Sequence, residues 1–266
     1  MAVTDGARAA AGDPEGVARA TASAADGADA PGVLNLRPVV EGLVYRSSAP
    51  FGWDAHRVAG FLAEHRIETV VDLRSPAESA LVPWLLDARA QGEPLPELLS
   101  APLDPTEGRP SSRRSIDTAR DLGELYLWWA EERPDMVARS LAPIAAGRTT
   151  LLHCAAGKDR TGVVSAVVHL AAGHEPEDIV GDYARTSAAL PQILSALHGL
   201  YVRTHPGEEL PAFAADAPPV ILTAPAEAME VFLERFLDRH GTVEDYLLSA
   251  GLDRPALARL QHELRR

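Results

Sequence analysis

The ten residues 153–162, HCAAGKDRTG, constrain the fold of this chain more than any other stretch. The segment TTLLHC at 149–154 predicts a short buried strand, and TGVVSAVVHLAAG at 161–173 predicts an apolar helix. A glycine-containing loop between a strand and a helix can bind an anion, because backbone N–H groups and the positive end of the helix dipole meet there. The sequence therefore predicts an α/β fold with an anion site at the carboxyl end of one strand.

The side chains of this loop point to covalent chemistry on a phosphate. Cys154 is the only cysteine, which excludes an intramolecular disulfide and a cysteine-based zinc site and leaves either core packing or a nucleophilic role. The helix terminus would stabilise a thiolate at Cys154, and the Arg160 guanidinium can grip two phosphate oxygens. Gly157 permits the tight curve of such a loop. The expected phosphate ligands are backbone groups of Ala155, Ala156, Gly157, Lys158, Asp159 and Arg160.

Three further side chains have expected roles around the loop. Lys158 is the only lysine among 25 Lys and Arg residues, and its ammonium is expected either to face the phosphate or to be solvated. The Thr161 hydroxyl could donate to the Cys154 sulfur and improve it as a leaving group. His153 could hydrogen-bond the loop from behind.

Composition and charge exclude several classes of protein. Hydrophobic residues make up 46% of the chain and charged residues 24%, which is ordinary for a globular domain with a sizeable core. The net charge of −13 opposes a general nucleic-acid or anionic-membrane surface. No apolar run of about 18 residues and no signal-peptide pattern occur, so we expect a cytoplasmic protein without membrane insertion. The nine histidines show no metal-binding spacing, so no metal and no cofactor is expected. The sequence does not indicate an oligomeric state.

Residues 31–266 are expected to form one domain after a disordered tail at 1–30, which is poor in large apolar side chains. The predicted architecture is a central sheet flanked by helices, with a helical C-terminal part. Tyr183 is expected to pack within that helical part. Besides 149–154, strands are predicted at 33–39, 42–47, 67–74 and 98–105. Helices are predicted at 53–66, 76–92 (irregular), 115–132, 133–147, 161–173, 176–190, 191–205, 225–241, 242–251 and 254–266.

Several blocks of the chain carry a family resemblance. They are HCAAGKDRTG, NLRPV with GLVYRSSAP, VVDLRSPAE, DIVGDYARTS and PAEAMEVFLERFLDRHGTVEDYLLSAGL, spread from about Leu34 to the C-terminus. Together they resemble the bacterial tyrosine phosphatases with a GKDRTG loop, within the cysteine-dependent protein tyrosine phosphatase superfamily. The resemblance implies a metal-free phosphatase that acts on phosphotyrosine, with some members accepting phosphoserine, phosphothreonine or phosphoinositides. It places the nucleophile at Cys154, which forms a phosphocysteine intermediate, and phosphate binding at Arg160.

The general acid has three candidates. Larger tyrosine phosphatases carry it on a Trp-Pro-Asp loop, and that tripeptide is absent here. Relatives with GKDRTG have an aspartate inside the loop, which corresponds to Asp159. Asp104, at the end of a predicted strand, is the second candidate. Asp72 is the third, and it could instead orient the loop.

Other functional hypotheses compete with the protein phosphatase. The same mechanism could serve a phosphoinositide or another small phosphate monoester. A rhodanese-like enzyme is disfavoured by the residues of the loop, and an arsenate-reductase-like enzyme by the lack of further thiols. A catalytically dead phosphate-binding module is disfavoured because Cys154 and Arg160 are both present. The segment from about Leu190 to Ala224 is either a movable lid or an ordinary helix with a surface loop.

Overall fold

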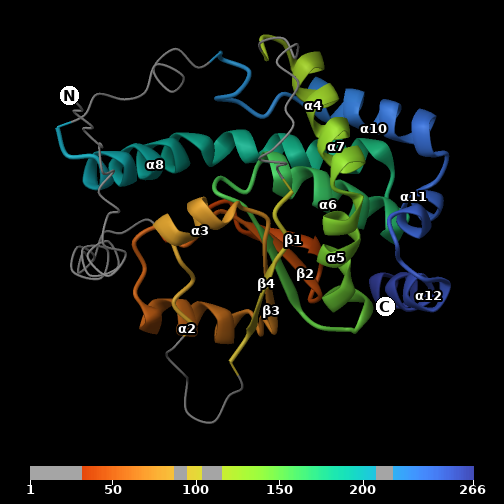
Figure 1. Cartoon of the computed structure of the whole chain (residues 1–266), viewed down its shortest axis with the longest axis horizontal. Helices are drawn as coiled ribbons and strands as arrows, with labels where there is room; N and C mark the ends of the chain where they lie inside the picture. Colours follow the sequence, from red (N-terminus) through yellow and green to blue (C-terminus); the bar gives the residue numbers. More distant parts are fainter. Residues whose placement is uncertain (1–31, 87–94, 104–115, 208–217) are drawn as a thin grey trace, which may run out of the picture.

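The computed structural model describes residues 32–86, 95–103, 116–207 and 218–266 (Figure 1). The expected tail at 1–30, Asp104 and most of the connector after the 191–205 helix lie outside these residues. The described strands are β1 (Arg37–Val40), β2 (Val44–Ser47), β3 (Thr69–Asp72), β4 (Glu97–Ser100) and β5 (Thr150–His153). The described helices are α2 (Ala55–Glu64), α3 (Pro76–Leu81), α4 (Ala119–Glu132), α5 (Pro134–Ala145), α6 (Asp159–Ala172), α7 (Pro176–Ala184), the short 3-10 helix η1 (Arg185–Ala188), α8 (Leu190–Thr204), α10 (Ala226–His240), α11 (Val243–Ser249) and α12 (Arg254–Leu264).

The five strands form one sheet in the order β1-β2-β5-β3-β4. The edge strand β1 runs antiparallel to β2, whereas β2, β5, β3 and β4 are parallel to one another. In a parallel sheet the carboxyl ends of the strands lie on one edge, which is where α/β proteins place their sites. Strand β5, which precedes the 153–162 loop, is the central strand.

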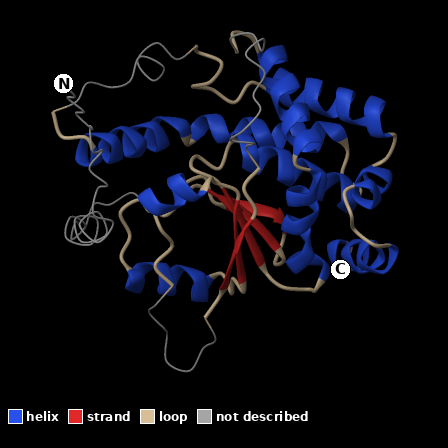
Figure 2. Cartoon of the chain, in the orientation of Figure 1, coloured by secondary structure: helices blue, strands red, loops and turns tan. Residues whose placement is uncertain are grey.

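Successive residues of the central strands enter two different hydrophobic cores. Val70 and Leu151 pack with α2, whereas Val71 and Leu152 pack with the large helical layer of α4, α5 and α6. This alternation follows from the two-residue period of a β-strand and explains why these strands are apolar on both faces. Figures 1 and 2 show the sheet between α2 on one side and the larger helical layer on the other. The expected α/β architecture is thereby confirmed.

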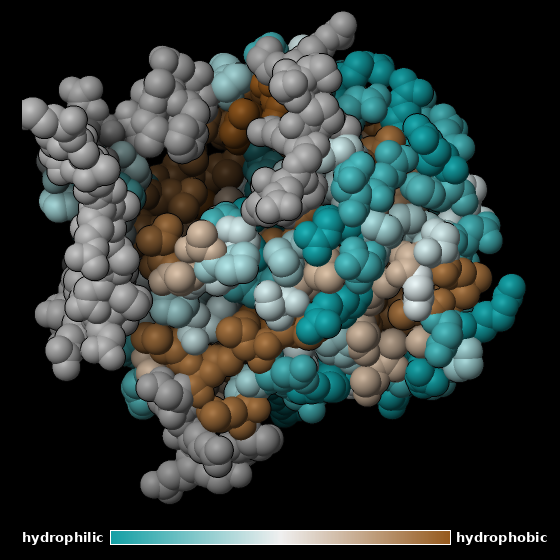
Figure 3. All heavy atoms as spheres, in the orientation of Figure 1, coloured by the Kyte–Doolittle hydropathy of each residue, from teal (hydrophilic) through white to brown (hydrophobic). Residues whose placement is uncertain are grey.

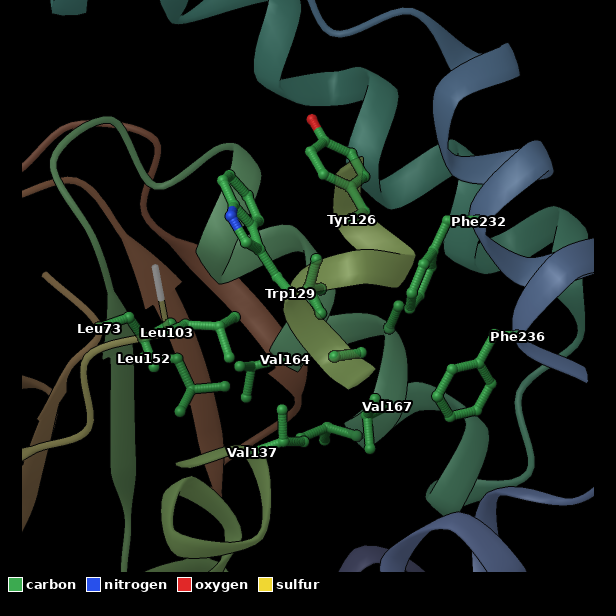
Figure 4. Packing of buried hydrophobic residues seen from close by; sticks show 14 of the residues in the cluster. Leu73, Leu103, Tyr126, Trp129, Val137, Leu152, Val164, Val167, Phe232 and Phe236 are labelled. Atoms are coloured by element: carbon green, nitrogen blue, oxygen red, sulfur yellow. The ribbon is translucent and has the colours of Figure 1, made fainter. Parts of the chain in front are cut away.

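The C-terminal helices complete the larger layer by packing around α6. Residues 161–169 of α6 are all buried, because α4, α5, α11 and α12 contact this helix in addition to the sheet. A helix that is apolar all round requires such an enclosure. Figure 4 shows Val164 and Val167 of α6 among side chains from α4, α5 and α10. No described helix is long and apolar enough to cross a membrane.

Several element boundaries differ from the sequence prediction, and three of them lie near the predicted site. Where an irregular helix was expected at 76–92, the structure has the short α3. A capping box between Ser75 and Glu78 begins this helix. It ends at Leu81, because Pro83 disfavours a helical conformation at Val82. Strand β4 stops at Ser100, short of the expected end. Helix α6 begins at Asp159, two residues earlier than predicted.

Candidate active site

The carboxyl edge of the parallel strands brings four polar residues into one row. Ser47 of β2 pairs with His153 of β5, His153 pairs with Asp72 of β3, and Asp72 pairs with Ser100 of β4. Three of these, Ser47, Asp72 and His153, are buried. Asp72, one of the three candidates for the general acid, therefore lies beside the start of the predicted anion-binding loop.

Residues 154–158 form the loop that joins β5 to α6, and its carbonyl groups are held by partners outside it. The Ala155 carbonyl accepts from the Ala49 N–H (3.0 Å), and the Gly157 carbonyl accepts from Arg46 (2.9 Å) and Asn35 (3.0 Å). No peptide bond among the described residues is cis, so the N–H of each peptide unit points opposite to its carbonyl. Fixing the carbonyls outward turns the N–H groups that follow them toward the inside of the loop, as an anion site requires.

Gly157 is the residue at which the loop curves. Its φ of +66° lies in the left-handed region that other residues rarely adopt. A Cβ at this position would lie 2.3 Å from the Ser47 carbonyl oxygen and 2.8 Å from the Ser48 nitrogen. Both the curvature and the close approach to the end of β2 therefore require glycine, as expected from the sequence.

A buried charge network supports the loop from behind. Arg46, which donates to the Gly157 carbonyl, also pairs with Asp182 of α7 at 2.5 Å, and Asp182 pairs with Arg37 of β1 at the same distance. Burial would raise the pKa of Asp182, but the contacts with His169, Arg46 and Arg37 outweigh burial and hold it well below its usual range. Two buried guanidinium groups thus share one carboxylate, which offsets part of the cost of burying their charges.

His153 supports the loop as the sequence predicts. Its Nε2 accepts from the indole of Trp84 (2.7 Å), so the ring proton is on Nδ1, which lies 3.1 Å from the Cys154 carbonyl. Burial lowers the pKa of His153 to about 4, which keeps this arrangement neutral at physiological pH.

Asp72 occupies a buried position next to His153. It accepts two hydrogen bonds from the Arg74 guanidinium and one from Ser79. Burial opposes ionisation, but the charges of protonated His153 and of Arg74 outweigh burial and lower the pKa of Asp72 to about 2. The lowered pKa disfavours Asp72 as a proton donor, and its hydrogen bonds go to Arg74 and Ser79, so the loop-orienting role considered for it stays a prediction.

Cys154 is buried directly after β5, and Arg160 lies in the first turn of α6. The Nη1 and Nη2 atoms of Arg160 donate to the two carboxylate oxygens of Glu78 at 2.6 and 2.7 Å. Glu78 Oε2 also accepts from the Ser75 N–H, so the capping box of α3 and the Arg160 contact share one carboxylate. Burial would raise the pKa of Glu78, but the paired Arg160 outweighs it and lowers the pKa.

Two loop side chains differ from their expected orientation. The Lys158 ammonium was expected to face the phosphate or to be solvated, but it is buried and donates to the carbonyls of Ile221 (2.6 Å) and Thr223 (2.8 Å). Because a buried charge must be compensated by partners, these two carbonyls and the Asp159 carboxylate at 3.2 Å take the place of water around the ammonium. The Thr161 hydroxyl is buried and has no hydrogen-bond partner among the described residues, so its expected donation to Cys154 stays a prediction.

Asp159 begins α6 and accepts a hydrogen bond from Tyr126 of α4 at 2.5 Å. Its Oδ1 also lies 3.2 Å from the Lys158 ammonium. The side chain remains 29% exposed, unlike that of Asp72. Of the three candidates for the general acid, Asp159 is thus the one that combines a position in the loop with partial exposure, and Asp104 lies outside the described residues.

The supporting residues Asn35, Arg46, Glu78, Tyr126 and Asp182 were not predicted from the sequence. Arg46 carried a signal, because an arginine within the apolar strand VYRS needs a buried anion. Asp182 carried a similar signal, because it is a charged residue next to Tyr183 on the apolar face of its helix. The other three partners become visible only after folding.

Comparison with known proteins shows the family of the chain. Residues 30–266 match the model of the tyrosine phosphatase family. The chain is 31% identical over 127 residues to the triple specificity protein phosphatase PtpB of Mycobacterium tuberculosis, and the match covers 46% of each chain, so it spans about half the length of that relative.

Solved structures give weaker similarities. TpbA of P. aeruginosa in complex with phosphotyrosine is 17% identical, with a TM-score of 0.31, over 59% of this chain and 80% of its own. The core catalytic domain of the PP-IP phosphatase SIW14 from S. cerevisiae is 18% identical, with a TM-score of 0.32, over 57% and 75%. The family match extends over all the elements that build the site, and this chain belongs to the tyrosine phosphatase family.

Proposed function

We propose that this protein is a phosphatase that hydrolyses phosphotyrosine, and also phosphoserine or phosphothreonine, through a phosphocysteine intermediate. The observation that carries the proposal is the loop between Cys154 and Arg160, whose carbonyls are bound from outside by Ala49, Arg46 and Asn35. This arrangement supports a site in which the Cys154 nucleophile, the Arg160 guanidinium and the loop N–H groups would bind one phosphate.

In the first step the Cys154 thiolate attacks phosphorus and forms the S–P bond. The P–O bond to the tyrosyl oxygen breaks, and the electron pair leaves with that oxygen, which takes a proton from Asp159. The loop N–H groups and Arg160 stabilise the charge on the three equatorial oxygens. Asp72 is poorly suited to the proton transfer because its pKa of about 2 leaves it ionised at neutral pH.

In the second step water attacks the phosphocysteine. The Asp159 carboxylate takes a proton from this water, the S–P bond breaks, and the electron pair returns to the Cys154 sulfur. Thr161 could stabilise the departing thiolate, since its buried hydroxyl has no hydrogen-bond partner among the described residues. The cycle releases inorganic phosphate and restores the enzyme.

A phosphoinositide or another small phosphate monoester is the second candidate substrate. The name of the relative PtpB, a triple specificity protein phosphatase, favours a broad substrate range for that protein. An ammonium of Lys158 that faced the phosphate would favour multiply phosphorylated lipids as substrates. The ammonium instead donates to the carbonyls of Ile221 and Thr223, which weakens the phosphoinositide hypothesis. We therefore place the phosphotyrosine reaction first.

The test compares the wild type with Cys154→Ser and Arg160→Ala on a phosphotyrosine peptide, a phosphoserine peptide and a water-soluble phosphoinositide. Each variant should lose at least about two decades of kcat/KM, because the nucleophile or the transition-state clamp is removed. A chelator should leave the rate unchanged. Activity retained by Cys154→Ser would refute the mechanism, and a higher kcat/KM on the phosphoinositide than on either peptide would reverse the substrate order.

A further inference from the structure

Two buried tyrosine hydroxyls lead from the helical core to Asp159. Tyr126 of α4 and Tyr183 of α7 are both fully buried, and their hydroxyl oxygens lie 2.7 Å apart. The Tyr126 hydroxyl also donates to Asp159 Oδ1. Figure 4 shows that this hydroxyl points away from the hydrophobic cluster into which the Tyr126 ring packs.

The chemistry of the groups fixes the direction of this chain of hydrogen bonds. A carboxylate only accepts, so Tyr126 must donate to Asp159, and its oxygen is then available to accept the proton of Tyr183. Burial raises the pKa of both tyrosines, and the nearby Asp159 charge raises it further, so both hydroxyls keep their protons throughout the working pH range. The order Tyr183 to Tyr126 to Asp159 is therefore permanent.

Ring packing does not account for these hydroxyls. The Tyr126 ring contacts Trp129, Tyr183 and Phe232, contacts that a phenylalanine would also make. Burying two phenolic hydroxyls is unfavourable unless they find partners, and the partner at the end of this chain is the loop carboxylate. Both contacts to the Asp159 carboxylate, from Tyr126 and from Lys158, reach the same oxygen, Oδ1. Fixing Oδ1 toward the core sets the rotation of the carboxyl group and assigns the transferred proton to Oδ2.

We propose that Tyr126, supported by Tyr183, is a positioning residue for the general acid Asp159, which it holds with Oδ2 directed to the leaving oxygen. The inference rests on the proposed function, in which Asp159 protonates the leaving group. If the general acid is misplaced, the rate falls most for substrates whose leaving oxygen is most basic, because these leaving groups depend most on protonation. The loss in Tyr126→Phe should therefore depend on the leaving group, which a defect in folding or phosphate binding would not produce.

The experiment measures kcat/KM for phenyl phosphate, a poor leaving group, and 4-nitrophenyl phosphate, a good one. Tyr126→Phe should lose roughly 10- to 100-fold on phenyl phosphate and less than about 3-fold on 4-nitrophenyl phosphate. Tyr183→Phe should show the same pattern with smaller losses, because Tyr126 keeps its bond to Asp159. In an Asp159→Asn background, Tyr126→Phe should have no further effect, since the group that it positions is gone.

Tyr246→Phe is the matched control, because Tyr246 is also buried and its hydroxyl donates to the Ala130 carbonyl instead of to the loop. Its loss of rate should not depend on the leaving group. Equal losses of Tyr126→Phe on both substrates, or an undiminished effect in Asp159→Asn, would overturn the positioning role alone. A loss in Asp159→Asn that does not depend on the leaving group would overturn both the positioning role and the assignment of the general acid, while Cys154→Ser still decides the phosphatase proposal.

Discussion

At the scale of single residues, Gly157 allows the loop at 154–158 to pack closely against the neighbouring strand. The Ser47 carbonyl lies where a Cβ would be, so the loop and the end of β2 can approach this closely only because residue 157 lacks a side chain. The approach places Arg46 within reach of the Gly157 carbonyl. Loop shape and loop support therefore depend on the same position.

Gly157→Ala should abolish activity. The left-handed φ costs about 1–2 kcal/mol for alanine, and the 2.3 Å approach to Ser47 forces the loop backbone to move as well. We expect a loss of kcat/KM of at least about 100-fold, measured with 4-nitrophenyl phosphate.

Gly173→Ala separates these two effects. Gly173 is the residue that ends helix α6, and its φ of +83° is also left-handed. A Cβ added there would meet no atom within 4 Å. The variant should lose about 1 kcal/mol of unfolding free energy and keep its activity. If both variants lose activity alike, the left-handed φ that both positions share is responsible, and the collision with Ser47 is not.

At the scale of elements, α3 acts as a support for Arg160. Its N-terminus is fixed by the capping box and its C-terminus by a hydrogen bond from Arg74 to the Val82 carbonyl. Glu78 thus presents its carboxylate to Arg160 from a helix held at both ends. The bond between them orders the guanidinium before substrate binds, which lowers the entropic cost of gripping the phosphate.

Glu78→Gln should weaken the binding of inorganic phosphate. We expect the inhibition constant to rise about tenfold, with kcat/KM falling similarly, because Arg160 loses its charged partner. Glu97→Gln, which breaks the more exposed pair with Arg148, is the control and should change neither constant. Tighter phosphate binding in Glu78→Gln would mean that Glu78 competes with the substrate for Arg160.

The order of elements and the position of the loop could be predicted because they follow from local periodicity. The positions of Cys154 and Arg160 were predictable for the same reason, since one strand, one loop and one helix place them, while their catalytic roles stay predictions. The partners of the loop could not be predicted, because Arg46 and Asp182 are 136 residues apart and Tyr126 and Asp159 are 33 apart. Such pairs depend on how helices cross the sheet, which no local pattern encodes.

At the scale of the whole molecule, one face of the sheet shares a core with the larger helical layer, and the other face packs with α2. Figure 3 shows that hydrophobic surface remains exposed on the side of α3 and α8, where Leu81 and Val202 are among the exposed apolar residues. Residues of α8 pack there against Phe51 and Val82. Whether α8 moves as a lid stays a prediction, because residues 208–217 lie outside the described part.

Stability should fall as the pH drops from about 6.5 to 4. Folded His153 has a pKa of about 4, whereas the unfolded chain binds a proton near its ordinary value of 6.5. Protons therefore favour the unfolded chain in this window, by up to about 3 kcal/mol. Asp72, with a folded pKa of about 2, adds a further loss at lower pH, between about 3.8 and 2.

Urea unfolding of the wild type and His153→Gln between pH 7 and 4.5 tests this expectation. The variant should show a flatter dependence on pH, and His56→Gln, at an exposed position, should follow the wild type. His174 and His240, whose pKa values are also lowered by burial, contribute equally to all three proteins. Parallel curves for wild type and His153→Gln would contradict the role of His153.

The bonds from Lys158 to the carbonyls of Ile221 and Thr223 have a consequence for sequence variation. Main-chain carbonyl groups are present whatever side chain a residue carries. The two hydrogen bonds from Lys158 therefore do not constrain the identities of residues 221 and 223. Ile221 and Leu222 are themselves partly exposed. Evolution or a mutant library can therefore vary the side chains of this segment, and with them the surface that it presents, while a single lysine keeps the backbone in place.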